Sequence, residues 1–158
     1  MQIQEIKDDK KKLNISREIL EDLKDWFEIE SAREAYIKES QDQLFYCAYY
    51  DLKAVGFLTL KETGNKTMEI GVIGVLRDYH QKGIGRALID TARKDLKLKT
   101  YDFLQVKTLA MGKDKYYDKT NLFYQKIGFS EFELIVEIWG EENPCQIYII
   151  KTGDKEPW

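Results

Sequence analysis

The feature that most constrains this chain is a change of hydrophobic period on either side of two glycines. Residues 67–76, TMEIGVIGVL, are rich in β-branched residues and predict a strand. Beyond the first glycine, an apolar residue recurs at every fourth position, which predicts a helix with one buried face: Ile84, Leu88, Ala92 and Leu96. The chain therefore passes from strand to helix within a few residues. The unpaired N–H groups of the first helical turn then project from the edge of the sheet.

The same periods predict the order of elements along the rest of the chain. Helices are expected from Ser16 through Phe27, from Ser31 toward Gln41, and over 116–127. Ser31 and Glu34 are expected to form a capping box at the start of the second helix, and Gly128 to cap the end of the third. Strands are expected over 2–7, 44–50, 54–60, 103–109, 129–139 and 145–151, with 44–76 forming an antiparallel meander. This order predicts one α+β domain over residues 1–158, with a mixed, mainly antiparallel sheet flanked by helices.

Composition narrows the classes of function. Of the 158 residues 43% are apolar, yet no stretch reaches the roughly 20 apolar residues that a membrane-spanning helix needs. Residues 1–12 mix acids with bases and contain no apolar segment, so we expect no secretory signal and a cytoplasmic location. A net charge of −3 leaves no basic surface of the kind that holds nucleic acid.

Cysteine and histidine are too few to suggest a metal site. Cys47 and Cys145 show no ligand spacing, and His80 is the one histidine of the chain. Both thiols are expected to be buried and inert, and His80 to be a solvent-facing loop residue. The charged run from Lys7 to Lys12 is expected to be a solvated face without a role.

The two glycines predict a phosphate site. Gly83 and Gly85 lack the Cβ atoms that would keep a phosphate away from the N–H groups at the start of the helix. The Walker pattern is absent, and the dinucleotide pattern G-x-G-x-x-G has Leu88 at its third glycine. ATP and NAD are therefore disfavoured as ligands.

Two segments resemble signatures of the GNAT superfamily of acyltransferases. Residues 75–88, VLRDYHQKGIGRAL, resemble its acetyl-CoA loop, [RQ]-x-x-G-x-[GA], with His80 at the first position. Residues 122–129, LFYQKIGF, resemble its second signature, F-Y-x-x-x-G-F, although Tyr117 stands where the family usually has Asn. The resemblance implies a GNAT-like fold and the activity of an acetyl-CoA-dependent N-acetyltransferase. Its acceptor would be a primary amine of a small molecule or peptide, which attacks the thioester directly. The alternative is a non-catalytic acyl-CoA-binding or regulatory module, and a homodimer is the default assembly.

The resemblance also implies roles for particular residues. The coenzyme would contact Ile73, Gly74, Val75, Gln81, Lys82, Gly83, Ile84, Gly85 and Arg86. Tyr124 matches the tyrosine that protonates the leaving thiolate, and its other interpretation is a core aromatic residue. Glu69 occupies the strand where part of the family carries a general base, and its other interpretation is a solvated strand residue. An N–H group near Val75 would stabilise the oxyanion, and Gly71 and Gly74 are compatible with either a bulge or close packing there.

Overall fold

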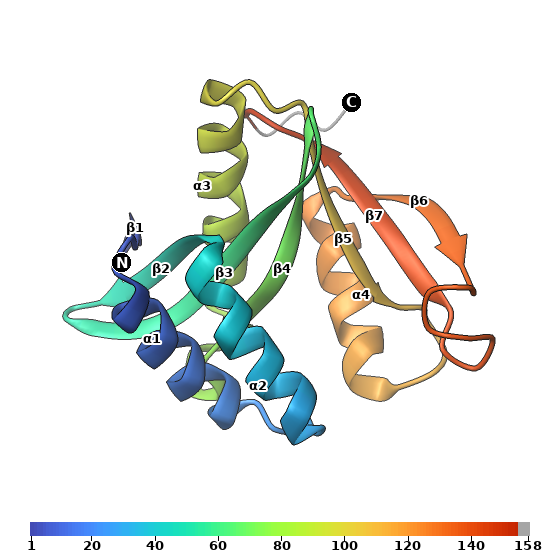
Figure 1. Ribbon diagram of the computed structural model, residues 1–158, viewed down its shortest axis with the longest axis horizontal. Coiled ribbons are helices and arrows are strands. Elements are labelled where there is room, and N and C mark those ends of the chain that lie inside the picture. The colour runs from blue at the N-terminus through green and yellow to red at the C-terminus, as the bar shows by residue number, and fades with distance from the viewer. Residues whose placement is uncertain (155–158) are drawn as a thin grey trace. The chain divides into compact units, whose positions relative to one another are not determined.

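The computed structural model describes residues 1–154 and contains the predicted order of helices and strands. The elements are β1 (Gln2–Glu5), α1 (Asp9–Asp22), α2 (Glu30–Glu39), β2 (Leu44–Tyr50), β3 (Lys53–Gly64), β4 (Thr67–Val75), α3 (Ile84–Leu98), β5 (Phe103–Leu109), α4 (Lys115–Ile127), β6 (Ser130–Ile135) and β7 (Cys145–Lys151). Two 3₁₀ turns, Ser40–Asp42 and Arg77–Tyr79, precede β2 and α3. Hydrogen bonding orders the strands β1-β2-β3-β4-β5-β7-β6 (Figure 1).

The sheet is mixed and mainly antiparallel, as expected. Antiparallel pairs join β1 to β2, β2 to β3, β5 to β7 and β6 to β7. The start of β4 pairs in parallel with β5, from Thr67 opposite Phe103 to Glu69 opposite Gln105. By their contacts the residues form two compact units, 1–62 with 70–92 (the first unit) and 63–69 with 93–154 (the second unit).

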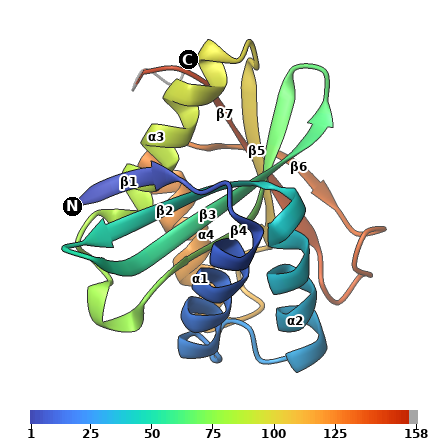
Figure 2. The same ribbon diagram turned by 60° about the vertical axis from the view of Figure 1, so that its left-hand side comes forward.

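Helices cover both faces of the strands in the first unit. A Cβ atom at Gly74 of β4 would lie 3.1 Å from Ile19 of α1, whereas one at Gly56 of β3 would lie 3.0 Å from Ile84 of α3. These two glycines therefore permit a close approach of helix to sheet on opposite faces. Figure 2 shows α1 and α2 side by side against the strands of this unit.

In the second unit α4 packs beside β5 and ends where the sequence predicts. Gly128 adopts φ 119°, and its N–H bonds to the carbonyls of Tyr124 and Gln125, so a residue with a side chain would be strained at this position. Asn121 of α4 donates from Nδ2 to the carbonyl of Leu109 at 2.8 Å and thereby fastens the helix to the end of β5.

Several boundaries differ from the prediction. The first helix begins at Asp9, capped by Asp8, and it ends at Asp22, so its first turn contains charged residues that the apolar period does not mark. The expected capping box is wrong because α2 begins at Glu30 without a side-chain cap, and Glu34 instead accepts two bonds from Arg17, at 2.6 and 2.9 Å. The sixth strand ends at Ile135, before the predicted 139.

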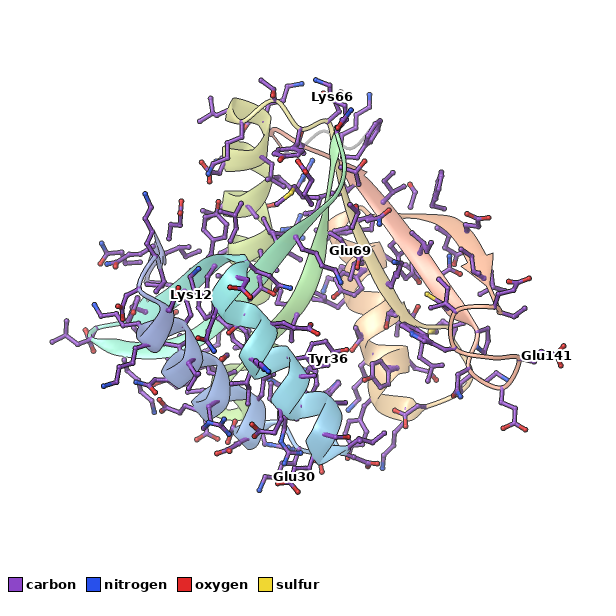
Figure 3. The ribbon with its side chains drawn as sticks, viewed as in Figure 1. Lys12, Glu30, Tyr36, Lys66, Glu69 and Glu141 are labelled. Carbon is purple, nitrogen blue, oxygen red and sulfur yellow. The ribbon has the colours of Figure 1, made fainter. Side chains whose placement is uncertain are left out.

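The charged run before residue 13 was expected to be solvated, and for Lys12 this is wrong. Its side chain is only 8% exposed, and Nζ donates to the carbonyls of Gln41 at 3.1 Å and Gln43 at 2.8 Å (Figure 3). The ammonium thus supplies hydrogen-bond donors to two carbonyls at the 3₁₀ turn before β2. No local sequence pattern predicts this contact.

Within residues 1–154 no helix has both the length and the apolar character to cross a membrane.

The substitution Lys12→Met tests this contact. Methionine keeps the helix propensity and leaves the two carbonyls without a charged donor, so we expect the free energy of unfolding to fall by about 1–3 kcal/mol. Lys10→Met, at an exposed position of the same helix, serves as the matched control and should change it by less than about 0.5 kcal/mol. Urea unfolding measures both. Equal stability of the two variants would contradict the role of Lys12.

Candidate active site

The joint between β4 and α3 forms an exposed turn of backbone N–H groups. The first backbone hydrogen bond of the helix runs from Ala87 N to Gly83 O at 3.0 Å, so the N–H groups just before Ala87 lack an intrahelical acceptor. Gln81 and Gly83 have φ of 60° and 77°, and within residues 1–154 nothing lies within 4 Å of a Cβ atom placed at Gly83. An anion can therefore approach this backbone closely.

Polar contacts fasten the segment before these glycines. Arg77 donates from its backbone N to Asp22 Oδ2 at 2.7 Å and from its guanidinium to Asp25 at 2.8 Å, and it lies over the ring of Trp26. His80 is half-buried against the edge of Trp26, and its Nε2 lies 2.7 Å from the carbonyl oxygen of Val75. The expectation of a solvent-facing His80 is thus wrong, because the ring bridges the loop back to the end of β4.

The strand that enters the loop carries two closely packed glycines. A Cβ atom at Gly71 would lie 2.7 Å from both Gln43 Oε1 and Thr59 Oγ1, and one at Gly74 would touch Ile19 and Leu23. Close packing therefore accounts for both glycines. Between them Val72 N donates to Thr59 Oγ1 at 3.0 Å, a side-chain acceptor within the sheet.

The residues expected to contact the coenzyme all lie in the first unit. They form the end of β4, the loop and the first turn of α3. The exposed ones are Gln81, Lys82, Gly83 and Arg86, the half-buried ones are Ile73, Val75 and Gly85, and the buried ones are Gly74 and Ile84. Exposure is therefore concentrated in the loop, where the anion is expected.

Glu69, in the second unit, is a buried carboxylate with two polar partners. It is 4% exposed, accepts from Gln105 Nε2 at 2.8 Å and pairs with Lys107 Nζ at 3.2 Å (Figure 3). The interpretation as a solvated strand residue is therefore wrong. Both partners come from β5, the parallel neighbour of β4, so only the pairing of the strands brings this cluster together.

Tyr124, also in the second unit, lies among aromatic rings on the buried side of α4. It is 3% exposed, and its ring centroid lies 5.3 Å from that of Phe129 and 5.9 Å from that of Tyr148. The packing expected of a core aromatic residue is therefore present, and it orients the ring on a helix whose C-terminus is capped by Gly128.

A buried polar network beside Tyr124 was missed by the sequence analysis. Tyr148 donates its hydroxyl proton to Asn121 Oδ1 at 2.7 Å and accepts from Gln125 Nε2 at 2.9 Å. Burial raises the pKa of Tyr148, because the phenolate would be poorly solvated there. The available signal was that Tyr117, Asn121 and Tyr124 share one face of α4, which places an amide among buried residues.

Both cysteines are buried and free, as expected. Burial raises the pKa of the Cys47 thiol to about 11, and it also raises the pKa of Cys145. Each thiol is therefore neutral near pH 7 and poorly suited to act as an acylated nucleophile. Among residues 1–154 no group of three or more histidine, cysteine or acidic side chains is placed to hold a metal ion.

Comparisons with solved structures agree with this architecture. A GNAT-family protein from Desulfovibrio desulfuricans has a TM-score of 0.82 at 19% identity, and the match covers 96% of this chain and 99% of that one. An aminoglycoside 6′-N-acetyltransferase complexed with coenzyme A has a TM-score of 0.74 at 17% identity, with 100% and 99% covered. A Bacillus anthracis protein in complex with acetyl coenzyme A has a TM-score of 0.61 at 21% identity, with 70% and 63% covered. At sequence identities this low, the structural similarity shows that the fold is shared.

The family itself is shown by the sequence. A search of curated proteins found no match. The family model described as acetyltransferase (GNAT) domain matches residues 41–131, which include the glycine loop and the second signature. Because that match spans more than half of the chain, the protein belongs to the GNAT family of acetyltransferases.

Proposed function

We propose that the protein transfers the acetyl group of acetyl-CoA to a primary amine of a small molecule or peptide by direct attack on the thioester. The observation that carries this proposal is the open turn of N–H groups at the start of α3, within the region that matches the acetyltransferase domain. The match to a catalytic family favours transfer over a purely binding or regulatory module. We also propose that residues 1–158 form one N-acetyltransferase domain, which acts in the cytoplasm and has a C2 dimer as its default assembly.

The loop binds the pyrophosphate of the coenzyme in this proposal. Backbone N–H groups of Gly83, Ile84 and Gly85 donate to the phosphate oxygens, and the positive end of the helix dipole adds to the attraction. Lys82 and Arg86 supply exposed cationic side chains at the same turn. On the other side of the loop, the end of β4 pairs through Ile73, Gly74 and Val75 with the pantetheine arm, and a backbone N–H near Val75 stabilises the oxyanion.

Gly83→Val tests the loop. A side chain at this position projects into the open space that the pyrophosphate would occupy, so we expect the Kd for acetyl-CoA to rise at least tenfold, about 1.4 kcal/mol. Gly140→Val is the matched control, since Gly140 has φ 91° and equally open surroundings but lies between β6 and β7. Both variants carry similar backbone strain, and only the first should lose affinity in calorimetric titration. Unchanged affinity in Gly83→Val would overturn the loop assignment.

Tyr124 protonates the departing thiolate in the proposed mechanism. A phenol with an ordinary pKa near 10 is protonated at neutral pH and can donate. The rings of Phe129 and Tyr148 restrict the position of this side chain, as a catalytic donor requires. The two interpretations of Tyr124 are therefore compatible, because the same packing that makes it a core residue also orients its hydroxyl.

Tyr124→Phe separates catalysis from packing. The ring is retained, so we expect little change in Tm, while kcat should fall roughly ten- to a thousandfold with a nearly constant KM for the coenzyme. Tyr148→Phe is the control, since it removes a hydroxyl that bonds to Asn121 and Gln125 and should cost stability, about 1 kcal/mol, with kcat within about threefold. Steady-state kinetics and thermal unfolding measure both. Wild-type turnover in Tyr124→Phe would remove Tyr124 as the acid.

Glu69 accepts the proton of the attacking amine, directly or through a water molecule, in the same mechanism. Lys107 Nζ lies 3.2 Å from Oε1 of this carboxylate, and the pair holds the proposed base in position. Gln105 Nε2 donates to the same carboxylate oxygen, Oε1, that Lys107 contacts, and this second contact further restricts the position of the carboxylate.

Glu69→Gln removes the base and can still accept the bond from Gln105. We expect kcat/KM to fall about a hundredfold or more. Lys107→Gln is the control, because it breaks the same ion pair and leaves the carboxylate in place. It should keep kcat/KM within about tenfold of the parent. If the two variants lower kcat/KM to the same extent, or differ from the parent only in stability, the carboxylate has a structural role and is not the base.

A further inference from the structure

We propose that the free edge of β6, together with the turn that follows it, binds an extended, lysine- or arginine-rich segment of a partner protein. We call residues 130–142 the edge surface, and all of them belong to the second unit. The inference goes beyond acetyl transfer and does not depend on it.

The strand β6 has one edge that no other strand covers. It pairs with β7 and comes last in the hydrogen-bonded order of the sheet (Figure 1). Within residues 1–154 no strand pairs with its other edge, so the N–H and C=O groups there are open to a further strand. An extended peptide adds to a sheet at such an edge through main-chain hydrogen bonds.

Exposed apolar side chains gather on the edge surface. Within residues 1–154 eleven large apolar side chains are exposed, and five of them fall in a stretch of eight residues: Phe132, Leu134, Val136, Ile138 and Trp139. Phe132 is 62% exposed and lies where the register of β6 shifts against β7. Single exposed apolar residues are common, whereas an apolar cluster rimmed by charged residues marks an interaction site.

The charge of the edge surface favours a basic partner. Its charged residues are all acidic: Glu131, Glu133, Glu137, Glu141 and Glu142. All five are exposed, and within residues 1–154 none of them forms an ion pair. Figure 3 shows Glu141 at the tip of the turn between β6 and β7. Lysine or arginine side chains of a partner would supply the opposite charge.

A second copy of this chain suits the edge surface poorly. Pairing of two β6 edges would bring Glu131 and Glu133 of both copies together, and like charges on paired strands are destabilising. Nucleic acids and anionic membranes meet the same repulsion. A segment in which lysine or arginine alternates with apolar residues provides both the opposite charge and the apolar contact.

Binding of a synthetic peptide to the full chain, without acetyl-CoA, tests the inference. The probe is a capped peptide of alternating lysine and valine, about eight residues long, and the reference peptide has glutamate in place of each lysine. We expect the lysine peptide to bind at least tenfold more tightly in calorimetric titration, about 1.4 kcal/mol. It should also slow the hydrogen exchange of amides in β6, since added strand pairing protects them.

A pair of charge variants tests the glutamates. Glu131→Gln combined with Glu133→Gln should weaken binding of the lysine peptide about fivefold or more. Glu18→Gln combined with Glu39→Gln, at exposed positions of α1 and α2, removes the same charge elsewhere. This control should change the affinity by less than about twofold.

A pair of apolar variants tests the cluster. Phe132→Ser should weaken binding of the lysine peptide about fivefold or more, because its ring is the most exposed of the five apolar side chains. Leu98→Ser, at the exposed end of α3, is the matched control and should leave the affinity unchanged. Thermal unfolding of each variant shows whether a loss of affinity reflects a loss of folded protein.

The outcomes separate a basic partner from the other occupants. Equal affinity for the two peptides, no binding of either, unchanged affinity in Phe132→Ser, or unaltered exchange in β6 would overturn the proposal. A dimer that Phe132→Ser converts to a monomer would also overturn it, because a second copy would then occupy the edge surface. None of these results bears on acetyl transfer, which is measured by turnover.

Discussion

The loop proposed to bind the coenzyme depends on the contacts that fasten the segment between β4 and α3. Leu76 N bonds to Val55 O at 2.8 Å, Arg77 bonds to the end of α1, and His80 reaches back to the carbonyl of Val75. A helix N-terminus attracts an anion only when its N–H groups are held in position and left exposed. In this protein charged and aromatic side chains hold the segment, and within residues 1–154 the space beside Gly83 stays open.

In the second unit the buried polar side chains of Glu69 and Tyr148 both have polar partners. Glu69 has Gln105 and Lys107, while Tyr148 has Asn121 and Gln125. A buried polar group without such partners would lose its hydration and gain nothing in return. The same contacts that avoid this cost also restrict the side chains to defined positions, which acid–base chemistry needs.

Local signals were sufficient for much of the fold. The strand Phe103–Leu109, the strand Cys145–Lys151 and the cap at Gly128 lie where period and composition predict them, because each is a continuous apolar pattern or a residue with a special backbone conformation. The start of α1 and the beginning of α2 were predicted wrongly. In α1 the first turn is charged, and in α2 the glutamate that suggested a capping box bonds instead to Arg17 of another helix.

The sequence by itself determined the order of elements, the glycine loop and the family signatures, since all of these are encoded in neighbouring residues. It also marked Tyr124 and Glu69 as candidates, although their catalytic roles remain proposals. Only the tertiary structure decided which side chains surround them. The carboxylate of Glu69 meets an ammonium from the adjacent strand, Lys12 meets carbonyls about 30 residues away, and the ring of Tyr50 at the end of β2 meets that of Tyr79 before α3. Such contacts join residues distant in sequence, and no local period records which of them the folded chain brings together.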